Sequence, residues 1–569
     1  MIILGISCYY HDSAACILKN GRVIAAAEEE RFSRKKHDNS FPEKAIEFCL
    51  NSLGIAINEV NIIVFYEKPI IKFERILSQH LEHFPKSRKV FVDNLASWLT
   101  EKLYLKKVLK EKCHYHGKVQ FIPHHLTHAA SSFYLSGFKK AAIVTMDGLG
   151  EWASTTMGVG DGKKIKIDKE IRFPHSLGLF YSTITAYLGF KVNNDEYKVM
   201  GLAGYGNPNK YLQHFSKLIT TFKDGSFVLN MKYFDYSWAN HMPSKHMEKL
   251  FGYPIRKKGL KIYNYHQDIA AALQKKLEEV VFNLLRAVYK KYKINNLCLA
   301  GGVALNSVVN GKIISNTPFK NIYIPPAPGD AGGAMGAALS VYYQHSNKNW
   351  NKDFQPYLGP GYSFLEIKKI LDKYKFKYKW YKNKKKLIDK VSDLIIKEKI
   401  IAWFQGKMEW GPRALGNRSI LASATKKEMM NILNLKIKHR ESFRPFAPVI
   451  LDKYIYKYFK ADKILSSAVK YMLMVYPVTK KGKKEVPAIV HVNGSGRLQS
   501  ISHQDNPLYF NLIDSYRKKT GIPIIINTSF NVRGEPIVCT PEDAVKCFLG
   551  TDIDFLAIGD FLVKKGKNV

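Results

Sequence analysis

The stretch from Pro123 to Trp152, PHHLTHAASSFYLSGFKKAAIVTMDGLGEW, constrains this chain more than any other. It opens with His124 and His128, four residues apart, before a run of small and apolar residues. On a helix this spacing places both imidazoles on one face, about one turn apart. A strand is then predicted from Ala141 to Met146, which delivers Asp147 at its end. Two histidines on one helical face and a carboxylate at a strand end indicate a divalent-metal site.

Two observations qualify this interpretation. The zinc-peptidase pattern requires a glutamate directly after the first histidine, and His125 stands there. A pair of histidines at i and i+4 is also compatible with an ordinary polar helix surface. The spacing alone leaves both interpretations open.

Length and composition predict a large intracellular protein. At 569 residues, of which 46% are apolar, the chain should form about three domains or two large α/β units. Met1 leads straight into a strand-like IILGIS, and no apolar run reaches the roughly 18 residues of a membrane span. The seven cysteines are scattered without a CxxC pair, which argues against disulfides and fits a reducing compartment. We therefore expect a cytoplasmic protein.

The formal net charge of +40 is large and has two interpretations. It would favour phosphate-bearing ligands, nucleic acid or an anionic membrane face. A high positive charge is also expected when an AT-rich genome favours lysine codons, because most lysines lie on protein surfaces. We favour the second interpretation, and so expect no nucleic-acid partner. The short apolar runs predict that the chain has no membrane span.

The first part of the chain shows a repeated pattern. Residues 2–30 are predicted to form three strands, with a hairpin turn at Asn20-Gly21. A second hairpin-like pair follows Asp147 and turns at Asp161-Gly162. The repeat resembles the duplicated halves of the actin-like fold, in which a nucleotide lies between two lobes. Two successive strand-glycine-helix units, LCLAGGVALN and IYIPPAPGDAGGAMGAA, suit an anionic ligand at a helix N-terminus, although tight packing of strand on helix would also need these glycines.

A second domain is predicted after a polar segment rich in Pro and Gly at residues 345–362. Its alternating Lys and aromatic residues between Lys373 and Lys386 favour a strand over a platform for single-stranded nucleic acid. Arginines here lie in segments that are otherwise apolar, and their planar guanidinium groups suit phosphate oxygens. Internal salt bridges with Glu441 and Glu535 are the alternative.

Several motifs in one order resemble the NodU/CmcH family of O-carbamoyltransferases along essentially the whole chain. They are YHDSAA (10–15), EEERFSRKKHD (28–38), HHLTHAASSF (124–133), DGLGEW (147–152), NDEYKVMGLAGYG (194–206), GGVALN (301–306), PGDAGGAMGAA (328–338), GPRALGNRSI (411–420), KHRESFRPFAPVIL (438–451) and NTSFNVRGEPIV (527–538).

The resemblance implies an α/β protein of two domains. Residues 1–350 would form an actin-like (ASKHA) domain similar to the tRNA threonylcarbamoyl transferase TsaD, with a metal and a nucleotide site. Residues 356–569 would form a YrdC-like α+β domain that makes carbamoyl-adenylate. Iron(II) or a similar divalent ion would be held by His124, His128, Asp147 and Asp330.

The resemblance also implies three further groups of residues. The nucleotide site of the first domain would comprise Gly148, Glu196, Lys198, Gly301, Gly302 and Asn306. Carbamoyl phosphate and ATP would be bound in the second domain by Arg413, Arg418, Lys438, Arg440, Arg444, Arg497, Asn527 and Ser529. His11 and Lys36 fall where the family places catalytic residues on the acceptor side.

The reaction implied by the resemblance has two steps. Carbamoyl phosphate and ATP, with Mg²⁺, would give carbamoyl-adenylate in the second domain. The first domain would pass the carbamoyl group to a hydroxyl of a small molecule, with His11 as general base. A sugar hydroxyl on an antibiotic, a polysaccharide precursor or a lipo-oligosaccharide is the family-level expectation, and a homodimer is left open. The alternatives are an enzyme of the tRNA threonylcarbamoyl-adenosine type and a non-catalytic, ATP-dependent switch.

Overall fold

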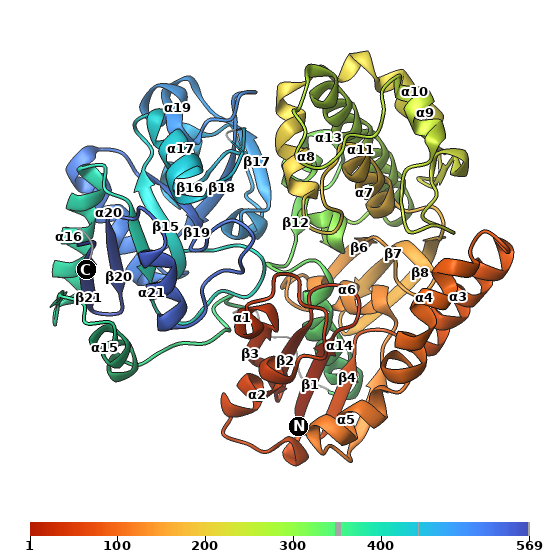
Figure 1. Cartoon of the computed structure of the whole chain (residues 1–569), viewed down its shortest axis with the longest axis horizontal. Helices are drawn as coiled ribbons and strands as arrows, with labels where there is room; N and C mark the ends of the chain where they lie inside the picture. Colours follow the sequence, from red (N-terminus) through yellow and green to blue (C-terminus); the bar gives the residue numbers. More distant parts are fainter. Residues whose placement is uncertain (347–353, 442, 567–569) are drawn as a thin grey trace. The chain divides into compact units, whose positions relative to one another are not determined.

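The chain forms two compact units in a computed structural model, which describes residues 1–346, 354–441 and 443–566 (Figure 1). The first unit comprises Met1–Glu29 and Asn39–Phe354, and the second comprises Glu30–Asp38 and Gln355–Val569. The units divide within the predicted linker at 345–362, of which residues 347–353 lie outside the described part. No sequence pattern indicated that residues 30–38 belong to the second unit.

The first sheet of the first unit has the strand order β3-β2-β1-β4-β5. Strand β1 pairs antiparallel with β2 and parallel with β4. The predicted turn at Asn20-Gly21 closes the β2–β3 hairpin, and both residues have the positive φ that such a turn requires, 52° and 81°. The strands are β1 (Ile2–Ser7), β2 (Ala14–Lys19), β3 (Arg22–Glu28), β4 (Ile62–Phe65) and β5 (Lys118–Phe121).

The second sheet repeats this topology. Its order is β12-β11-β6-β7-β8, in which β6 pairs antiparallel with β7 and parallel with β11. The predicted turn at Asp161-Gly162 joins β7 to β8. The prediction of duplicated halves is therefore confirmed. The strands are β6 (Lys140–Met146), β7 (Ala153–Asp161), β8 (Lys164–Arg172), β11 (Asn296–Ala300) and β12 (Asn321–Tyr323).

Two helices that pack against each other carry the site. Helix α6 (His124–Phe133) contacts α14 (Asp330–His345), and α14 also lies against β1 and β2 (Figure 1). Glycines on α14 permit this close approach: a Cβ on Gly336 would lie 1.8 Å from the carbonyl oxygen of Thr127. The two helix N-termini therefore have a fixed spacing.

Other helices complete the first unit. The region around residues 71–110 is mainly helical and contains α3 (Pro69–Glu82), α4 (Arg88–Ser97) and α5 (Leu105–Cys113). The long helix α11 (Asn264–Tyr292) packs on α7 (Leu177–Tyr187) and α8 (Glu196–Leu202). After β11 the chain forms a short 3₁₀ turn, Gly302–Leu305, followed by the one-turn helix α12 (Ser307–Asn310). Across the described ranges, no helix is long and apolar enough to cross a membrane.

The second unit is a further α/β domain built on a mixed sheet of order β13-β21-β20-β14-β15-β19-β16-β18-β17. Helices α16 (Lys384–Ile396) and α20 (Pro507–Thr520) pack together over a core that includes Trp403 and Tyr509. The predicted strand in the Lys-aromatic segment is present but short. The strands are β13 (Tyr378–Trp380), β14 (Ile401–Phe404), β15 (Arg418–Ser423), β16 (Ala447–Leu451), β17 (Met474–Pro477), β18 (Ser495–Ile501), β19 (Ile524–Ser529), β20 (Phe555–Ile558) and β21 (Phe561–Lys564).

Candidate functional site

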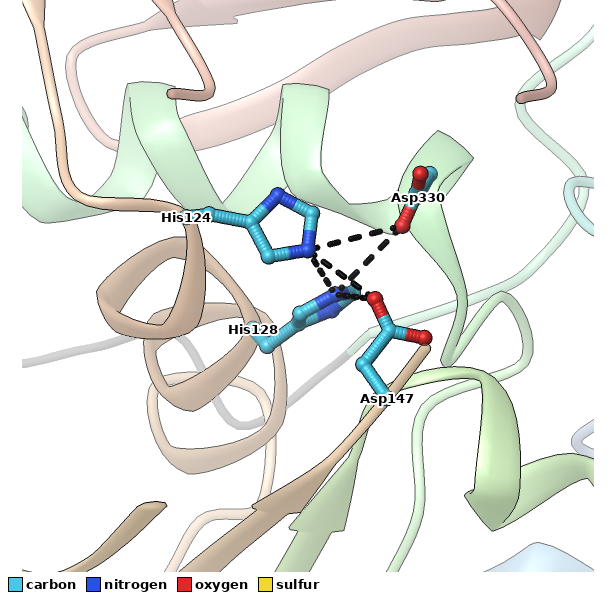
Figure 2. A group of neighbouring side chains, drawn as sticks. All are labelled: His124, His128, Asp147 and Asp330. Atoms are coloured by element: carbon cyan, nitrogen blue, oxygen red, sulfur yellow. Dashed lines mark hydrogen bonds and ion pairs between the residues drawn. The ribbon is translucent and has the colours of Figure 1, made fainter. Parts of the chain in front are cut away.

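Four buried side chains of the first unit converge on one point (Figure 2). His124 and His128 lie on the first turns of α6, Asp147 follows β6, and Asp330 begins α14. The Nε2 atoms of the two histidines are 3.0 Å apart, and Asp147 Oδ2 lies 3.0 Å from His124 Nε2 and 3.3 Å from His128 Nε2. Asp330 Oδ1 is 3.6 Å from each of the two nitrogens. The structure thus brings together all four predicted ligands.

The spacing of these donor atoms fits one metal ion. Bonds of about 2.1 Å from an ion to nitrogen and oxygen ligands place neighbouring donors about 3.0 Å apart in octahedral and about 3.4 Å apart in tetrahedral geometry. The separations among His124, His128 and Asp147, 3.0–3.3 Å, fall in this range, and the 3.6 Å from Asp330 to each histidine lies about 0.2 Å beyond it. Two imidazole and two carboxylate ligands suit iron, manganese, cobalt or zinc. The group can therefore hold a divalent metal.

Electrostatics at this centre favour a positive charge. Burial lowers the pKa of His128, but Asp147 and Asp330 outweigh burial and raise it to about 9. Burial likewise raises the pKa of Asp147, while hydrogen bonds from His124 and His128 hold it well below its usual range. Two buried carboxylates thus stabilise a cation between them, which a metal ion supplies in place of protons.

Neighbouring residues orient the predicted metal ligands through hydrogen bonds. Asp147 uses its other oxygen, Oδ1, to accept the backbone N–H of Gly302 at 2.8 Å. Glu151 accepts the backbone N–H of His124 at 3.0 Å and that of Lys68 at 2.8 Å, and so anchors the N-terminus of α6. Glu151 was not among the predicted site residues, although a carboxylate in the DGLGEW turn beside a histidine helix was the available signal.

The middle histidine, His125, has a structural role. Its Nε2–H donates to the carbonyl of Ala153 at 2.9 Å, and its Nδ1 accepts from the Thr145 hydroxyl at 2.7 Å. Burial and the neighbouring histidines lower its pKa to about 3. His125 is therefore a neutral imidazole that ties α6 to the strands β6 and β7.

Three of the residues predicted for the nucleotide site surround Asp147. Gly148 follows it directly, and Gly301 and Gly302 meet it from the end of β11. A Cβ on Gly301 would lie 2.2 Å from the carbonyl oxygen of Met146, and its φ is +91°. Glycine is therefore required at this position.

The other predicted nucleotide residues are held by neighbours on the helices. Asn306 caps α12 and donates to Gln274 Oε1 at 2.9 Å. Glu196 accepts the Ser182 hydroxyl at 2.8 Å, and Lys198 pairs with Asp195 at 2.9 Å.

The predicted catalytic residues His11 and Lys36 lie in different units. His11 Nδ1 is 2.8 Å from Asp12 Oδ2, and His11 Nε2 is 2.7 Å from the carbonyl oxygen of Asn193. Burial lowers the pKa of His11, but Asp12 and the Asn193 carbonyl outweigh it and raise the pKa to about 10. His11 is therefore protonated at neutral pH and must lose a proton before it can act as a base. Lys36 belongs to the second unit, not to the first as predicted.

In the second unit, Lys438 lies beside Ser529. The buried Lys438 ammonium donates to the carbonyl of Ser529 and, at 2.8 Å each, to the carbonyl and side-chain oxygens of Asn531. Burial, Arg440, Arg444 and Lys36 lower the pKa of Lys438 well below its usual value. Several positive charges thus gather at this point, which is the environment that a phosphate group requires.

Some of the predicted ligands also form internal pairs. Arg444 Nη1 is 3.4 Å from Glu441 Oε2, and Arg533 Nη2 is 3.2 Å from Glu441 Oε1. Arg440 donates to Asn434 Oδ1 at 2.7 Å. The alternative of internal salt bridges is therefore realised at Glu441. Arg413 and Arg497, both half-buried, lie in the loop before β15 and on β18.

Arg418 and Asn527, both predicted as ligands, form hydrogen bonds within the second unit. Arg418 is fully buried, and its guanidinium stacks 3.6 Å from the Phe404 ring. Asn527 donates to Gln499 Oε1 at 2.7 Å and to the Ala414 carbonyl at 3.2 Å. Arg418 donates to four backbone carbonyls, those of Gln405 (2.7 Å), Asn417 (3.0 Å), Pro360 (3.0 Å) and Gly406 (3.1 Å).

Comparison with known proteins defines the class of enzyme. The sequence matches "Carbamoyltransferase N-terminus" over residues 2–339 and "Carbamoyltransferase C-terminus" over residues 392–565. These are the domains of an enzyme that transfers a carbamoyl group. The chain belongs to the carbamoyltransferase family, as its motifs predicted.

Two relatives align along almost the whole chain and a third along half of it. An "Uncharacterized protein sll1178" of Synechocystis sp. is 44% identical over 99% of this chain and 96% of its own length. The "Nodulation protein NolNO" of Sinorhizobium fredii is 35% identical over 98% of this chain and 79% of its own. The "Nodulation protein U" of Rhizobium tropici is 32% identical over 50% of this chain and 47% of its own. A solved structure of full-length HypF is only distantly similar, with 13% identity, a TM-score of 0.33 and coverage of 62% of this chain and 56% of HypF.

Proposed function

We propose that this chain is an ATP-dependent O-carbamoyltransferase that works in two steps. One observation carries the proposal: a carbamoyltransferase chain holds a buried His₂Asp₂ group in its first unit and a separate cluster of cations around Lys438 in its second. The two groups suit different chemistry. The cations match phosphate groups, and the buried donors match a metal that polarises a carbonyl.

The first step would take place in the second unit, for which we propose a YrdC-like role. Water would hydrolyse carbamoyl phosphate to carbamate and inorganic phosphate, and a carbamate oxygen would then attack the α-phosphorus of ATP. The bond between the α-phosphorus and the bridging oxygen to the β-phosphorus would break and release pyrophosphate. Lys438, Arg440 and Arg444 would neutralise the phosphates. An anion beside the buried Lys438 would favour its charged form, which burial otherwise disfavours.

The second step would take place in the first unit, for which we propose a TsaD-like role. The acceptor hydroxyl would attack the carbamoyl carbon while AMP leaves, and His11 would receive the hydroxyl proton at Nε2. This requires that His11 first release the proton it donates to Asn193. His124, His128, Asp147 and Asp330 would hold the metal, with Fe²⁺ as our first candidate. A bound divalent ion would stabilise the negative charge that develops on the carbamoyl oxygen.

The acceptor is proposed only by class. A hydroxyl of a small molecule, with a sugar as the first candidate, follows from the family resemblance. The test is to incubate the purified protein with ATP, Mg²⁺ and carbamoyl phosphate and to measure pyrophosphate. Candidate acceptors are then searched by mass spectrometry for the gain of one carbamoyl group. Pyrophosphate release that does not depend on carbamoyl phosphate would contradict the first step.

The net charge of +40 is also compatible with an alternative function, an enzyme that acts on tRNA. Binding to tRNA draws on Lys and Arg contacts with phosphates and weakens steeply with salt. We expect only weak, salt-sensitive association with nucleic acid. Tight binding of one tRNA at physiological salt would favour the alternative.

A further inference from the structure

The second unit contains a segment from near the N-terminus of the chain. The polypeptide leaves the first unit after Glu29, contributes Glu30–Asp38 to the second unit and returns to the first at Asn39. We call Glu30–Asp38, ERFSRKKHD, the inserted segment. Because it arrives and departs through the first unit, the second unit cannot be completed by the C-terminal part of the chain alone.

Contacts within the inserted segment bring its two ends together. Glu30 begins the one-turn helix α1 (Glu30–Ser33) and is buried. Its Oε2 atom accepts the backbone N–H of His37 at 2.8 Å, and its Oε1 atom pairs with Arg31 at 2.8 Å. One carboxylate therefore joins the two ends of the segment and orients Arg31.

Arg31 contacts the first of two loops in the second unit. We call residues 411–416 the first loop and residues 529–540 the second loop. Its Nη2 atom donates to the carbonyl of Gly411 at 3.0 Å, and Arg31 is buried. Gly411 has a φ of +104° and opens the loop that carries Arg413. A charged donor on a carbonyl in this left-handed turn fixes where the loop begins.

Arg34 holds the second loop. Its Nη1 atom donates to the carbonyl of Ile537 at 2.7 Å, and its Nη2 atom donates to the carbonyl of Pro536 at 2.9 Å. Its Nε atom lies 3.6 Å from Asp543, which accepts the backbone N–H of Thr540 at 2.9 Å. The planar fork of Arg34 thus spans two consecutive carbonyls and the start of the next helix.

The two loops are linked by a small apolar cluster and lead to Lys438. Phe32 of the inserted segment packs against a cluster that takes residues from both loops. The second loop begins at Ser529. Oxygen atoms of Ser529 and of Asn531, two residues later, accept hydrogen bonds from the Lys438 ammonium. The buried members of the cluster are Met408, Ala414, Ile537 and Cys539.

We propose that the inserted segment positions the substrate-binding loops of the second unit, with Arg34 as the principal positioning residue. This rests on the proposed formation of carbamoyl-adenylate in that unit. A loop held by few buried contacts opens easily, and two charge-assisted hydrogen bonds from one side chain oppose such opening. The adenylate-forming step therefore depends on a side chain from the N-terminal part of the chain.

The experiment compares three variants of the full chain with the wild type: Arg34→Ala, Arg34→Lys and the control Arg22→Ala, which alters an exposed arginine on β3 of the first unit. Pyrophosphate release gives kcat and KM for carbamoyl phosphate and ATP. Metal content reports whether the first unit stays folded. Amide hydrogen exchange of residues 529–540 and 411–416 reports the two loops directly.

We expect Arg34→Ala to lose roughly 10–100-fold in kcat/KM for carbamoyl phosphate, because a small misplacement of binding groups has effects of this size. Exchange in both loops should rise while metal content stays at the wild-type level. Arg34→Lys should recover only part of the loss, since an ammonium cannot span both carbonyls. Arg22→Ala should match the wild type.

Two results would overturn the proposal. One is an Arg34→Ala variant with the kinetics and exchange of Arg22→Ala. The other is loss of metal together with activity, which would show a general defect in folding. If the wild type itself releases no pyrophosphate with carbamoyl phosphate, the proposed function fails, and hydrogen exchange still decides whether Arg34 orders the two loops.

Discussion

His124 and His128 direct their Nε2 atoms at each other across 3.0 Å, with two carboxylates beside them. Two imidazole nitrogens at this distance repel unless a proton or a metal ion lies between them. The i, i+4 spacing on α6 creates this geometry, and Asp147 and Asp330 supply the compensating negative charge.

The first prediction follows from this pair. Purified protein should carry about one divalent ion per chain, and His124→Ala or His128→Ala should lose it, since loss of a ligand costs more than the 10–100-fold in affinity of an outer-shell change. Elemental analysis of each protein measures this. His125→Gln is the matched control and should keep the ion, because His125 bonds to Thr145 and Ala153 instead. Full occupancy in a His124→Ala/His128→Ala double variant would refute the site.

The second prediction concerns stability and pH. His125 is held neutral, with a pKa of about 3 in the folded chain against an ordinary value of 6.5. Below pH 6.5 the unfolded chain therefore binds a proton that the folded chain does not. His125 should destabilise the fold by up to about 1.4 kcal/mol per pH unit between about pH 6.5 and pH 3, and should have no effect above this window.

The measurement is the free energy of unfolding of metal-free protein at several pH values between 4 and 8. His125→Gln should be less stable than wild type at pH 8, where it loses packing and hydrogen bonds, and should show a shallower decline below pH 6.5. Parallel pH profiles for the two proteins would contradict the assignment of His125 as a buried neutral imidazole.

The sequence allowed part of this site to be predicted, and the limits are physical. Periodicity gave the shared face of His124 and His128, because helix geometry relates residues four apart. It could not give Asp330, which lies far away in the sequence and entered only through the family resemblance. Local sequence also could not show that donors of Arg418 face backbone carbonyls, because these carbonyls lie in other segments of the chain.

The repeated topology of the two sheets could be predicted because each half contains a hairpin turn that the local sequence specifies. Asn20-Gly21 and Asp161-Gly162 each mark a hairpin whatever the rest of the chain does. The membership of residues 30–38 in the second unit is different. A polar segment carries no local signal of the distant loops to which its Arg31 and Arg34 side chains donate hydrogen bonds.

The third prediction concerns Arg418. Arg418→Ala removes four hydrogen bonds to backbone carbonyls in a fully buried position and leaves those carbonyls without donors. It should destabilise the second unit by about 3–5 kcal/mol. Thermal unfolding measures the effect, and metal content should stay unchanged. Arg172→Ala, which alters an exposed arginine, should cost less than about 0.5 kcal/mol. A stable Arg418→Ala protein that fails only in substrate binding would restore the role of a ligand.

The fourth prediction concerns His11. Its pKa of about 10 depends on the carboxylate of Asp12, so the rate of carbamoyl transfer at low acceptor concentration should rise with pH toward about 10. Asp12→Asn removes the negative charge that raises the pKa of His11. The rise of the transfer rate with pH should therefore occur at lower pH in this variant. His11→Ala should abolish transfer to the acceptor and leave pyrophosphate release intact. A transfer rate whose pH profile is identical in wild type and Asp12→Asn would exclude His11 as the titrating base.

The fifth prediction separates the two steps. Arg444→Ala should abolish the carbamoyl-phosphate-dependent release of pyrophosphate, and Arg444→Lys should fail substantially, because a point charge cannot replace a guanidinium fork on phosphate. His128→Ala should still release pyrophosphate but transfer no carbamoyl group to any acceptor. Both activities are measured side by side in each variant.

The ion pair between Arg444 and Glu441 supplies the control for this experiment. If Arg444 serves only that pair, Glu441→Gln should reproduce the defect of Arg444→Ala, since either change breaks the same contact. If Arg444 binds phosphate, Glu441→Gln removes a competing anion and should retain pyrophosphate release. Loss of both activities in a folded His128→Ala protein would mean that the two steps share one site. Retention of pyrophosphate release, together with loss of the acceptor product, would place adenylate formation and carbamoyl transfer on different units of the chain.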